Sequence, residues 1–212
     1  MNRMKEFVIV KPAKLLLWVS LFFTAGQALA TAELASHSAH AIVQSVQDQL
    51  LTTIRDDANI VETDEEAYFG KVQIILAPVV DFSYIARGVM GGYAKQASSE
   101  QRERFSEVFK YGLVSTYAKG MASYADREIA IVPPKTEIGG RKSISVAQEI
   151  RGPDGVNRVS YTMKLNREGD WKLVNVVLNG INLGITFRTQ FYQAMKKSSG
   201  NMDLVIAGWS AE

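Results

Sequence analysis

Hydrophobic side chains recur every three or four residues between residues 33 and 125, which is the pattern of amphipathic α-helices. The predicted helices cover residues 33–56, a segment beginning at Thr63, Phe82–Met90, and a long segment beginning at Ser98. Thr63 and Ser98 each stand three residues before a glutamate or glutamine, which is the arrangement of a capping box. Asp81 is a suitable N-cap for the third helix, and Gly91-Gly92 should end it.

After about Asp126 the hydrophobic period changes to two, which predicts β-strands. The predicted strands are Arg127–Val132, residues 144–150, residues 159–165 and a fourth strand that begins at Trp171. Gly152–Gly155 and Glu168–Asp170 provide short turns. Consecutive strands should therefore pair in antiparallel fashion and present one apolar face.

The fourth strand runs directly into another helix, since Gly180 ends the strand and Asn182 is a good N-cap. Leu183, Phe187, Phe191 and Met195 then recur every four residues. We expect this helix to fold back over the sheet, and a short apolar tail, Leu204–Trp209, to follow Gly200. The predicted fold class is α+β, with helices packed on one face of a curved, about four-stranded antiparallel sheet. Residues 31–212 should form a single domain.

The first 30 residues have the features of a secretory signal peptide. Lys5, Lys11 and Lys14 form a basic start, Leu15–Ala25 is an uncharged apolar run, and Ala28-Leu29-Ala30 has the A-x-A form of a cleavage site. A membrane anchor is the alternative, but the apolar run is short for the ~30 Å hydrocarbon core of a bilayer. We therefore expect cleavage after Ala30.

Charge and cysteine content narrow the classes of function. Residues 1–30 hold four of the 24 basic and one of the 22 acidic residues, so residues 31–212 hold 20 basic and 21 acidic ones. A net charge near −1 without a basic stripe argues against a nucleic-acid partner. The absence of cysteine excludes a disulfide scaffold, a thiol nucleophile and a thiolate metal site, and it fits a bacterial periplasm.

Candidate catalytic and metal-binding residues are few. The sequence contains no G-x-S-x-G elbow and no phosphate-binding glycine loop. His37 and His40 could share a metal ion, but they have no clear third ligand, and the simpler interpretation is two solvated histidines. The chain is instead rich in large apolar and aromatic side chains on faces that are predicted to meet: Phe105, Phe109, Tyr117, Tyr161, Met163, Phe187 and Phe191. An ordinary core accounts for any one of them.

A set of scattered positions follows the pattern of a known protein family. They are Asp81–Arg87, Val89–Gly91, Tyr93, Ser98, Gln101, Arg102, Arg104, Phe105, Phe109, Thr116, Tyr117, Tyr161, Trp171, Lys172, Val176, Gly180, Leu183, Arg188 and Phe191. In these residues the chain resembles the MlaC family, the periplasmic phospholipid-binding components of the Mla transport system, also called toluene-tolerance or ABC-transporter auxiliary proteins. It departs from the family pattern at Gly92, Ala94, Asn175, Asn179, Asn182 and Phe187.

The resemblance implies a fold, a function and partners. The fold would be a cone-shaped, nuclear-transport-factor-like α+β body whose apolar cavity, between sheet and helices, holds acyl chains. The function would be a monomeric periplasmic carrier that shuttles phospholipid between the outer and inner membranes and maintains outer-membrane lipid asymmetry. Its partners would be an inner-membrane ABC transporter with its substrate-binding ring and an outer-membrane lipoprotein complex. The resemblance implies no enzymatic activity and no cofactor, with phospholipid bound only as cargo.

On this interpretation the cavity is lined by inward strand positions and one helix face: Phe105, Phe109, Leu113, Val146, Ile150, Tyr161, Met163, Val174 and Val176. Arg87 and Arg188 are candidates for phosphate contacts at the rim, with surface ion pairs as the alternative. Two other classes of function stay open. An enzyme on the same fold would need an ionisable group deep in the cavity, where only Tyr161 and Gln148 are polar, and a protein-binding adaptor would have a filled core.

The Ala28-Leu29-Ala30 motif predicts that the processed protein begins at Thr31 and is soluble. The intact mass of protein recovered from the periplasmic fraction measures this directly. A product that keeps residues 1–30 and sediments with membranes would contradict the prediction.

Overall fold

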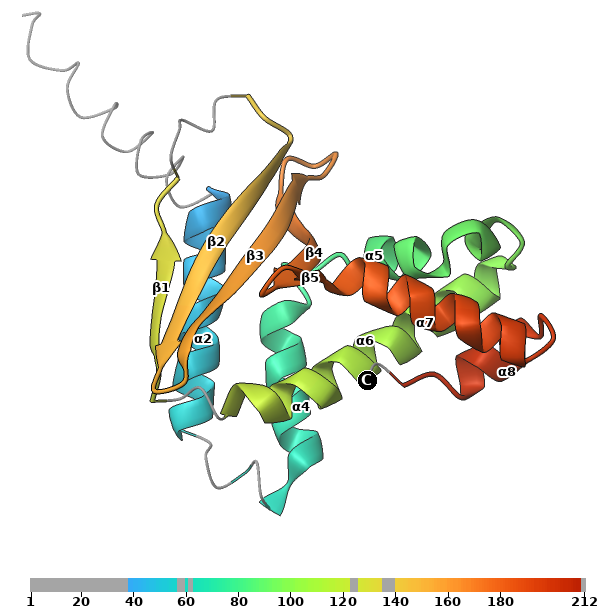
Figure 1. The fold of residues 1–212 in the computed structure, drawn as a ribbon, viewed down its shortest axis with the longest axis horizontal. Coiled ribbons are helices and arrows are strands. Elements are labelled where there is room, and N and C mark those ends of the chain that lie inside the picture. The colour runs from blue at the N-terminus through green and yellow to red at the C-terminus, as the bar shows by residue number, and fades with distance from the viewer. Residues whose placement is uncertain (1–37, 57–59, 61–62, 123–125, 135–139, 211–212) are drawn as a thin grey trace, which may run out of the picture. The chain divides into compact units, whose positions relative to one another are not determined.

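The computed structural model describes residues 38–56, 60, 63–122, 126–134 and 140–210 (Figure 1). The described residues belong to one compact unit. The helices are α2 (Ala39–Asp56), α4 (Glu65–Leu76), α5 (Phe82–Met90), the 3₁₀ turn η1 (Gly91–Lys95), α6 (Ser99–Ala122), α7 (Leu183–Lys197) and α8 (Met202–Ala207). Residues 1–37 lie outside the described residues, so the signal peptide and the solvated state of His37 remain predictions.

Most helix starts follow from their capping residues. The side chains of Asp81 and Asn182 accept hydrogen bonds from the backbone N–H groups of Tyr84 and Ile185, at 2.8 and 3.1 Å. Ser98 and Gln101 form the predicted capping box, in which each side chain accepts from the other residue's backbone N–H at 3.0 Å. The prediction for Thr63 was wrong by one position, because the side chain of Asp64 caps α4 instead.

The sheet has five antiparallel strands in the order β1–β2–β3–β4–β5: Glu128–Val132, Ser143–Gly152, Gly155–Leu165, Trp171–Leu178 and Ile181–Asn182. The first four match the predicted strands, and the two-residue β5 was not predicted. A β-bulge shifts the pairing of β3 with β4 at Thr162 and Met163. Val80, between α4 and α5, extends the sheet through a parallel bridge to Leu173, so the chain is tied to β4 where it passes from α4 to α5.

The buried residues fall into three clusters. The helical cluster is built by α5, α6, α7 and α8 around Phe105, Phe109, Phe187 and Phe191. A second cluster joins α2, α4 and α6 around Tyr68 and Val72. The sheet cluster joins Ala39 and Val43 of α2 to Val146 of β2 and Met163 of β3.

The expectation that α7 would cover the sheet is corrected by these clusters. The buried side chains of α7, Phe187, Phe191 and Met195, all lie in the helical cluster, and Gly184 at the start of α7 is hydrogen-bonded to Asn175 of β4. The helix that packs on the apolar face of β2 and β3 is α2 (Figure 1). The first described helix therefore packs against strand residues, Val146 and Met163, that follow it by more than a hundred residues.

Three asparagines stabilise the region where the chain passes from β4 through β5 into α7, and Asn179 also ties it to β3. Asn175 Oδ1 accepts a hydrogen bond from the backbone N–H of Gly184 at 3.2 Å. Asn179 adopts a positive φ of 48°, which asparagine tolerates better than most residues, and its side chain accepts from the backbone N–H of Arg158 at 2.8 Å. Asn182 caps α7.

The Asn175 contact requires glycine at position 184. A Cβ atom there would lie 2.6 Å from Asn175 Oδ1, so Gly184→Ala should lose the hydrogen bond and destabilise the protein by about 1–3 kcal/mol. Gly70→Ala is the matched control, because Gly70 lies within α4 and a Cβ there meets nothing within 4 Å. That change should stabilise by about 0.5–1 kcal/mol. Urea unfolding measures the free energy of unfolding of both variants. Equal changes in that free energy would contradict the view that the Asn175 contact requires glycine at position 184.

Candidate functional site

The strongest candidate for a binding site is the sheet cluster. Val146 and Met163 have no exposed surface, and they lie on the same face of β2 and β3 because Ile144 pairs with Met163 and Val146 with Tyr161. The side chains around them are apolar or aromatic: Ala39, Ile42, Val43, Val79, Ile131, Ile144, Tyr161, Trp171 and Leu173. This interface between α2 and the sheet is therefore dry and suited to hydrocarbon.

One polar chain crosses the interface. The Tyr161 hydroxyl donates to Gln148 Oε1 at 2.6 Å, and Gln148 Nε2 donates to Gln47 Oε1 of α2 at 2.7 Å. Gln148 is buried, so these bonds satisfy polar groups that would otherwise be costly inside the protein. They also fix α2 at one position along β2.

The polar groups in the sheet cluster are uncharged. Burial raises the pKa of the Tyr161 hydroxyl to about 12, so the phenol keeps its proton at physiological pH. Burial also lowers the pKa of His40 on α2, whose Nδ1 is buried without a hydrogen-bond partner. Within the described residues no group of three potential ligands could hold a metal ion. The sheet cluster thus has the chemistry of a binding surface for apolar groups.

The structure brings together only part of the predicted lining. Val146, Tyr161 and Met163 share the sheet cluster. Val176 stands opposite Tyr161, and Ile150 lies four residues along β2 from Val146; both are half-buried. Val174 is buried at the bulge in β4.

Phe105 and Phe109 lie elsewhere, in the helical cluster. Neither has exposed surface, and the ring of Phe105 stands 4.8 Å from that of Phe191 and 5.2 Å from that of Trp209, between ring centroids. Leu113, one turn further along α6, packs against both the helical cluster and the α2–α4–α6 cluster. The sequence placed these three on the correct face of α6, but that face meets other helices rather than the sheet.

Sequence reasoning missed the contribution of α2. Ala39, Ile42 and Val43 cover Val146 and Met163, and their spacing of three and four residues was visible in the sequence. Which strand face this stripe meets depends on a contact over more than a hundred residues, and no local pattern encodes it.

Arg87 and Arg188 lie on α5 and α7, outside the sheet cluster. Arg188 Nε donates to the backbone carbonyl of Gly88 at 2.7 Å, which joins α7 to α5. Arg87 is exposed on the same pair of helices. The two arginines are therefore close in the fold, and neither belongs to the sheet cluster around Met163.

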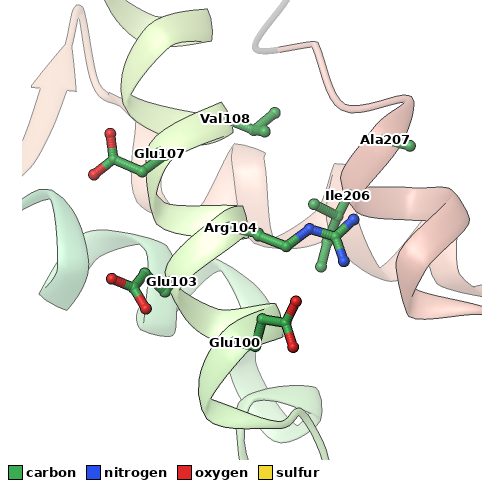
Figure 2. Close-up of a pocket in the computed structure, with 7 residues that line it drawn as sticks. All are labelled: Glu100, Glu103, Arg104, Glu107, Val108, Ile206 and Ala207. Atoms are coloured by element: carbon green, nitrogen blue, oxygen red, sulfur yellow. The ribbon is translucent and has the colours of Figure 1, made fainter.

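Two surface pockets lie among the helices. The first, of about 350 Å³, lies between α6 and α8 and is lined by Glu100, Glu103, Arg104, Glu107, Val108, Ile206 and Ala207 (Figure 2). Arg104 reaches across it to form an ion pair with Asp203 at 2.9 Å. The second, of about 480 Å³, lies between α7 and α8 beside Lys197 and Trp209. Neither pocket includes a residue of the sheet cluster.

The fold has a counterpart among solved structures. The phospholipid-binding protein from Ralstonia solanacearum, solved in complex with a phospholipid, superimposes with a TM-score of 0.72. The match covers 80% of this chain and 93% of that one at 24% identity, and it establishes that the two share an α+β fold.

Sequence comparison identifies the family. The model of the MlaC protein family matches residues 44–211. The toluene tolerance protein ttg2D of Pseudomonas putida is 34% identical over 180 residues, which cover 84% of this chain and 82% of that protein. The intermembrane phospholipid transport system binding protein MlaC of Haemophilus influenzae is 28% identical over 153 residues, 71% of each chain. The chain belongs to the MlaC family, as the resemblance of its scattered motifs predicted.

The raised pKa of Tyr161 predicts a loss of stability at alkaline pH. The unfolded phenol ionises near pH 10, whereas the buried one does so at about 12. The stabilisation is therefore complete below pH 10 and is lost as the pH rises from 10 to 12, by up to about 2–3 kcal/mol. Tyr161→Phe should cost about 1 kcal/mol at pH 7 through the lost hydrogen bond but decline less steeply above pH 10. Urea unfolding at each pH measures the free energy of unfolding of both proteins. If that free energy falls equally for both between pH 10 and 12, the assignment is contradicted.

Proposed function

We propose that this protein is a phospholipid carrier of the Mla transport system and that it holds acyl chains between α2 and the apolar face of the sheet. The observation that carries the proposal is the composition of the sheet cluster. Its core residues, Val146 and Met163, are fully buried among apolar side chains, and the polar chain Tyr161–Gln148–Gln47 that crosses the interface is neutral and internally hydrogen-bonded. Family membership and the phospholipid bound by the Ralstonia protein support the choice of cargo.

The energetics of lipid transfer explain why such a site is needed. Each methylene moved into water costs ~0.8 kcal/mol. Two acyl chains of roughly fifteen methylenes each therefore cost on the order of 20 kcal/mol to expose. A carrier must keep the tails dry and leave the charged head group in water. Neutral apolar walls meet this requirement, whereas an ionised group among the tails would destabilise the complex.

In this proposal α2 is the element that moves to admit the tails. It meets the centre of the sheet through the small side chains of Ala39 and Val43 and through the Gln47–Gln148 hydrogen bond. The large side chains of this interface, such as Met163 and Trp171, come from the strands and would stay with the sheet if α2 moved. Withdrawal of α2 would therefore leave an apolar groove along β2 and β3, whose walls would be extended by Ile150, Val174 and Val176.

The remaining parts of the proposal concern location, partners and chemistry. We place the mature chain, residues 31–212, in the periplasm, where it would exchange lipid with an inner-membrane ABC transporter and an outer-membrane lipoprotein complex. The Mla system named for the Haemophilus relative supports this assignment. Among the described residues, no helix is long and apolar enough to cross a bilayer. We propose a binding role without catalysis, because the polar groups described at the sheet cluster, which are a phenol, amides and the His40 imidazole, include no carboxylate that could act beside them.

Organic extraction of the purified protein tests the carrier proposal directly. A carrier should release phospholipid into the extract, and mass spectrometry identifies it. An adaptor with a filled core, or an enzyme, should yield none.

A pair of identical substitutions locates the site. Met163→Glu places a carboxylate between α2 and the sheet, where an opened groove would let water reach it, so the protein should fold but carry no phospholipid. Met195→Glu is the matched control: Met195 is equally buried but lies in the helical cluster, where the charge would cost several kcal/mol and prevent folding.

Circular dichroism melting beside lipid extraction reads out both variants. If both fail to fold, the sheet cluster is a closed core and α2 does not open. A folded Met163→Glu protein that still carries phospholipid would remove Met163 from the site.

A further inference from the structure

The helices α5 and α7 and the turn η1 form a surface on which positive charge is concentrated. Residues 82–97 and 181–201 contain Arg87, Lys95, Arg188, Lys196 and Lys197 but no aspartate or glutamate. Residues 31–212 hold 20 basic and 21 acidic residues in all. Without these five cations, the rest of that range holds 15 basic and 21 acidic residues. The charge of the protein is therefore strongly segregated, although its net value is close to zero.

The same surface exposes large apolar and aromatic side chains. Ile185 and Tyr192 of α7 are 60% and 56% exposed, and Tyr84 of α5 is 40% exposed. Ile185, Arg188 and Tyr192 follow one another at spacings of three and four residues, so they share one face of α7. The buried face of α7, which carries Phe187, Phe191 and Met195, lies beside this one and joins the helical cluster.

Contacts between the elements hold these side chains in place. The rings of Tyr93 in η1 and Tyr192 in α7 lie 6.1 Å apart. The Arg188 side chain lies against Gly88 and Gly91, where a Cβ at position 91 would meet its Cδ at 3.6 Å. At the sheet end, Lys164 Nζ donates to the Tyr84 hydroxyl at 2.6 Å. The surface is therefore assembled before any partner binds.

We propose that this α5–η1–α7 surface docks the protein onto an anionic phospholipid bilayer. Arginine and lysine are attracted to the phosphates of anionic head groups, and tyrosine and isoleucine are suited to the boundary between head groups and acyl chains. The absence of carboxylates from these segments removes the main source of repulsion. This inference rests on the proposed function as a phospholipid carrier, because docking would bring the site close to the membrane that supplies or receives the cargo.

Vesicle cosedimentation tests the docking surface. Protein purified from the periplasmic fraction is mixed with vesicles of phosphatidylethanolamine and phosphatidylglycerol, and separately with vesicles of phosphatidylcholine alone. Binding should be much stronger to the anionic vesicles and should weaken as salt screens the charges. Absence of binding to the anionic vesicles would overturn the proposal and leave the surface to an acidic protein partner.

Two variants identify the residues responsible. Arg87→Gln with Lys196→Gln removes two exposed cations from the surface, and at about fivefold for each charge the partition onto anionic vesicles should fall about 25-fold. Ile185→Ser with Tyr192→Ser should remove the binding that persists at high salt. The matched control is Arg151→Gln with Arg158→Gln, which removes the same charge from the β2–β3 hairpin. Equal losses in the control and the Arg87–Lys196 variant would overturn the assignment.

Lipid extraction separates this inference from the carrier proposal. Variants that lose vesicle binding should still contain bound phospholipid as purified, because the docking surface shares no residue with the sheet cluster. Wild-type protein that binds anionic vesicles but yields no phospholipid would support docking and refute the carrier proposal. Docking variants that purify without phospholipid would overturn the separation of the two surfaces.

Discussion

The packing of aromatic rings in the helical cluster is the interaction on which the rest of the structure depends. Phe105, Phe109, Phe191 and Trp209 bring α6, α7 and the C-terminal segment together, with centroid distances of 4.8 Å for Phe105–Phe191 and 5.8 Å for Phe191–Trp209. Such pairs contribute beyond the area they bury, and tight packing resists rearrangement. The centre of the helical cluster is thereby filled, which is consistent with placing the proposed site in the sheet cluster instead. The same packing presents the outer faces of α5 and α7 as a firm surface.

Local features of the fold could be predicted from the sequence because local interactions determine them. Asp81, Ser98 and Asn182 cap their helices through bonds that span three residues, and the alternation from Ile144 to Leu165 marks two strands. The strand β5 and the bulge at Met163 could not be predicted, since both depend on how β4 pairs with its neighbours. The make-up of the sheet cluster was predicted in part for the same reason. Strand alternation gave Val146, Tyr161 and Met163 correctly as inward residues, whereas the helix that covers them is distant in sequence.

Leu173 occupies a central place between the parts of the molecule. Its side chain packs against both the sheet cluster and the α2–α4–α6 cluster, and its backbone pairs with the segment that joins α4 to α5. Residues in contact with two clusters can transmit a change in packing from one to the other. Leu173 therefore links the sheet that α2 covers to the segment that leads into α5, which carries part of the cationic surface.

In the proposed opening of α2, the Tyr161–Gln148–Gln47 chain gives the closed state a single defined position. Apolar side chains alone would let α2 settle on the sheet at several offsets of nearly equal energy. A buried amide that is unsatisfied at every other offset removes this degeneracy, as a single polar residue fixes the register of a coiled coil. Half-closed arrangements would leave Gln148 Nε2 without its partner on α2 in an apolar environment, although Gln148 Oε1 would keep its bond from Tyr161. The helix should therefore move between two discrete positions rather than through a continuum, and the carrier would be either shut or open to cargo.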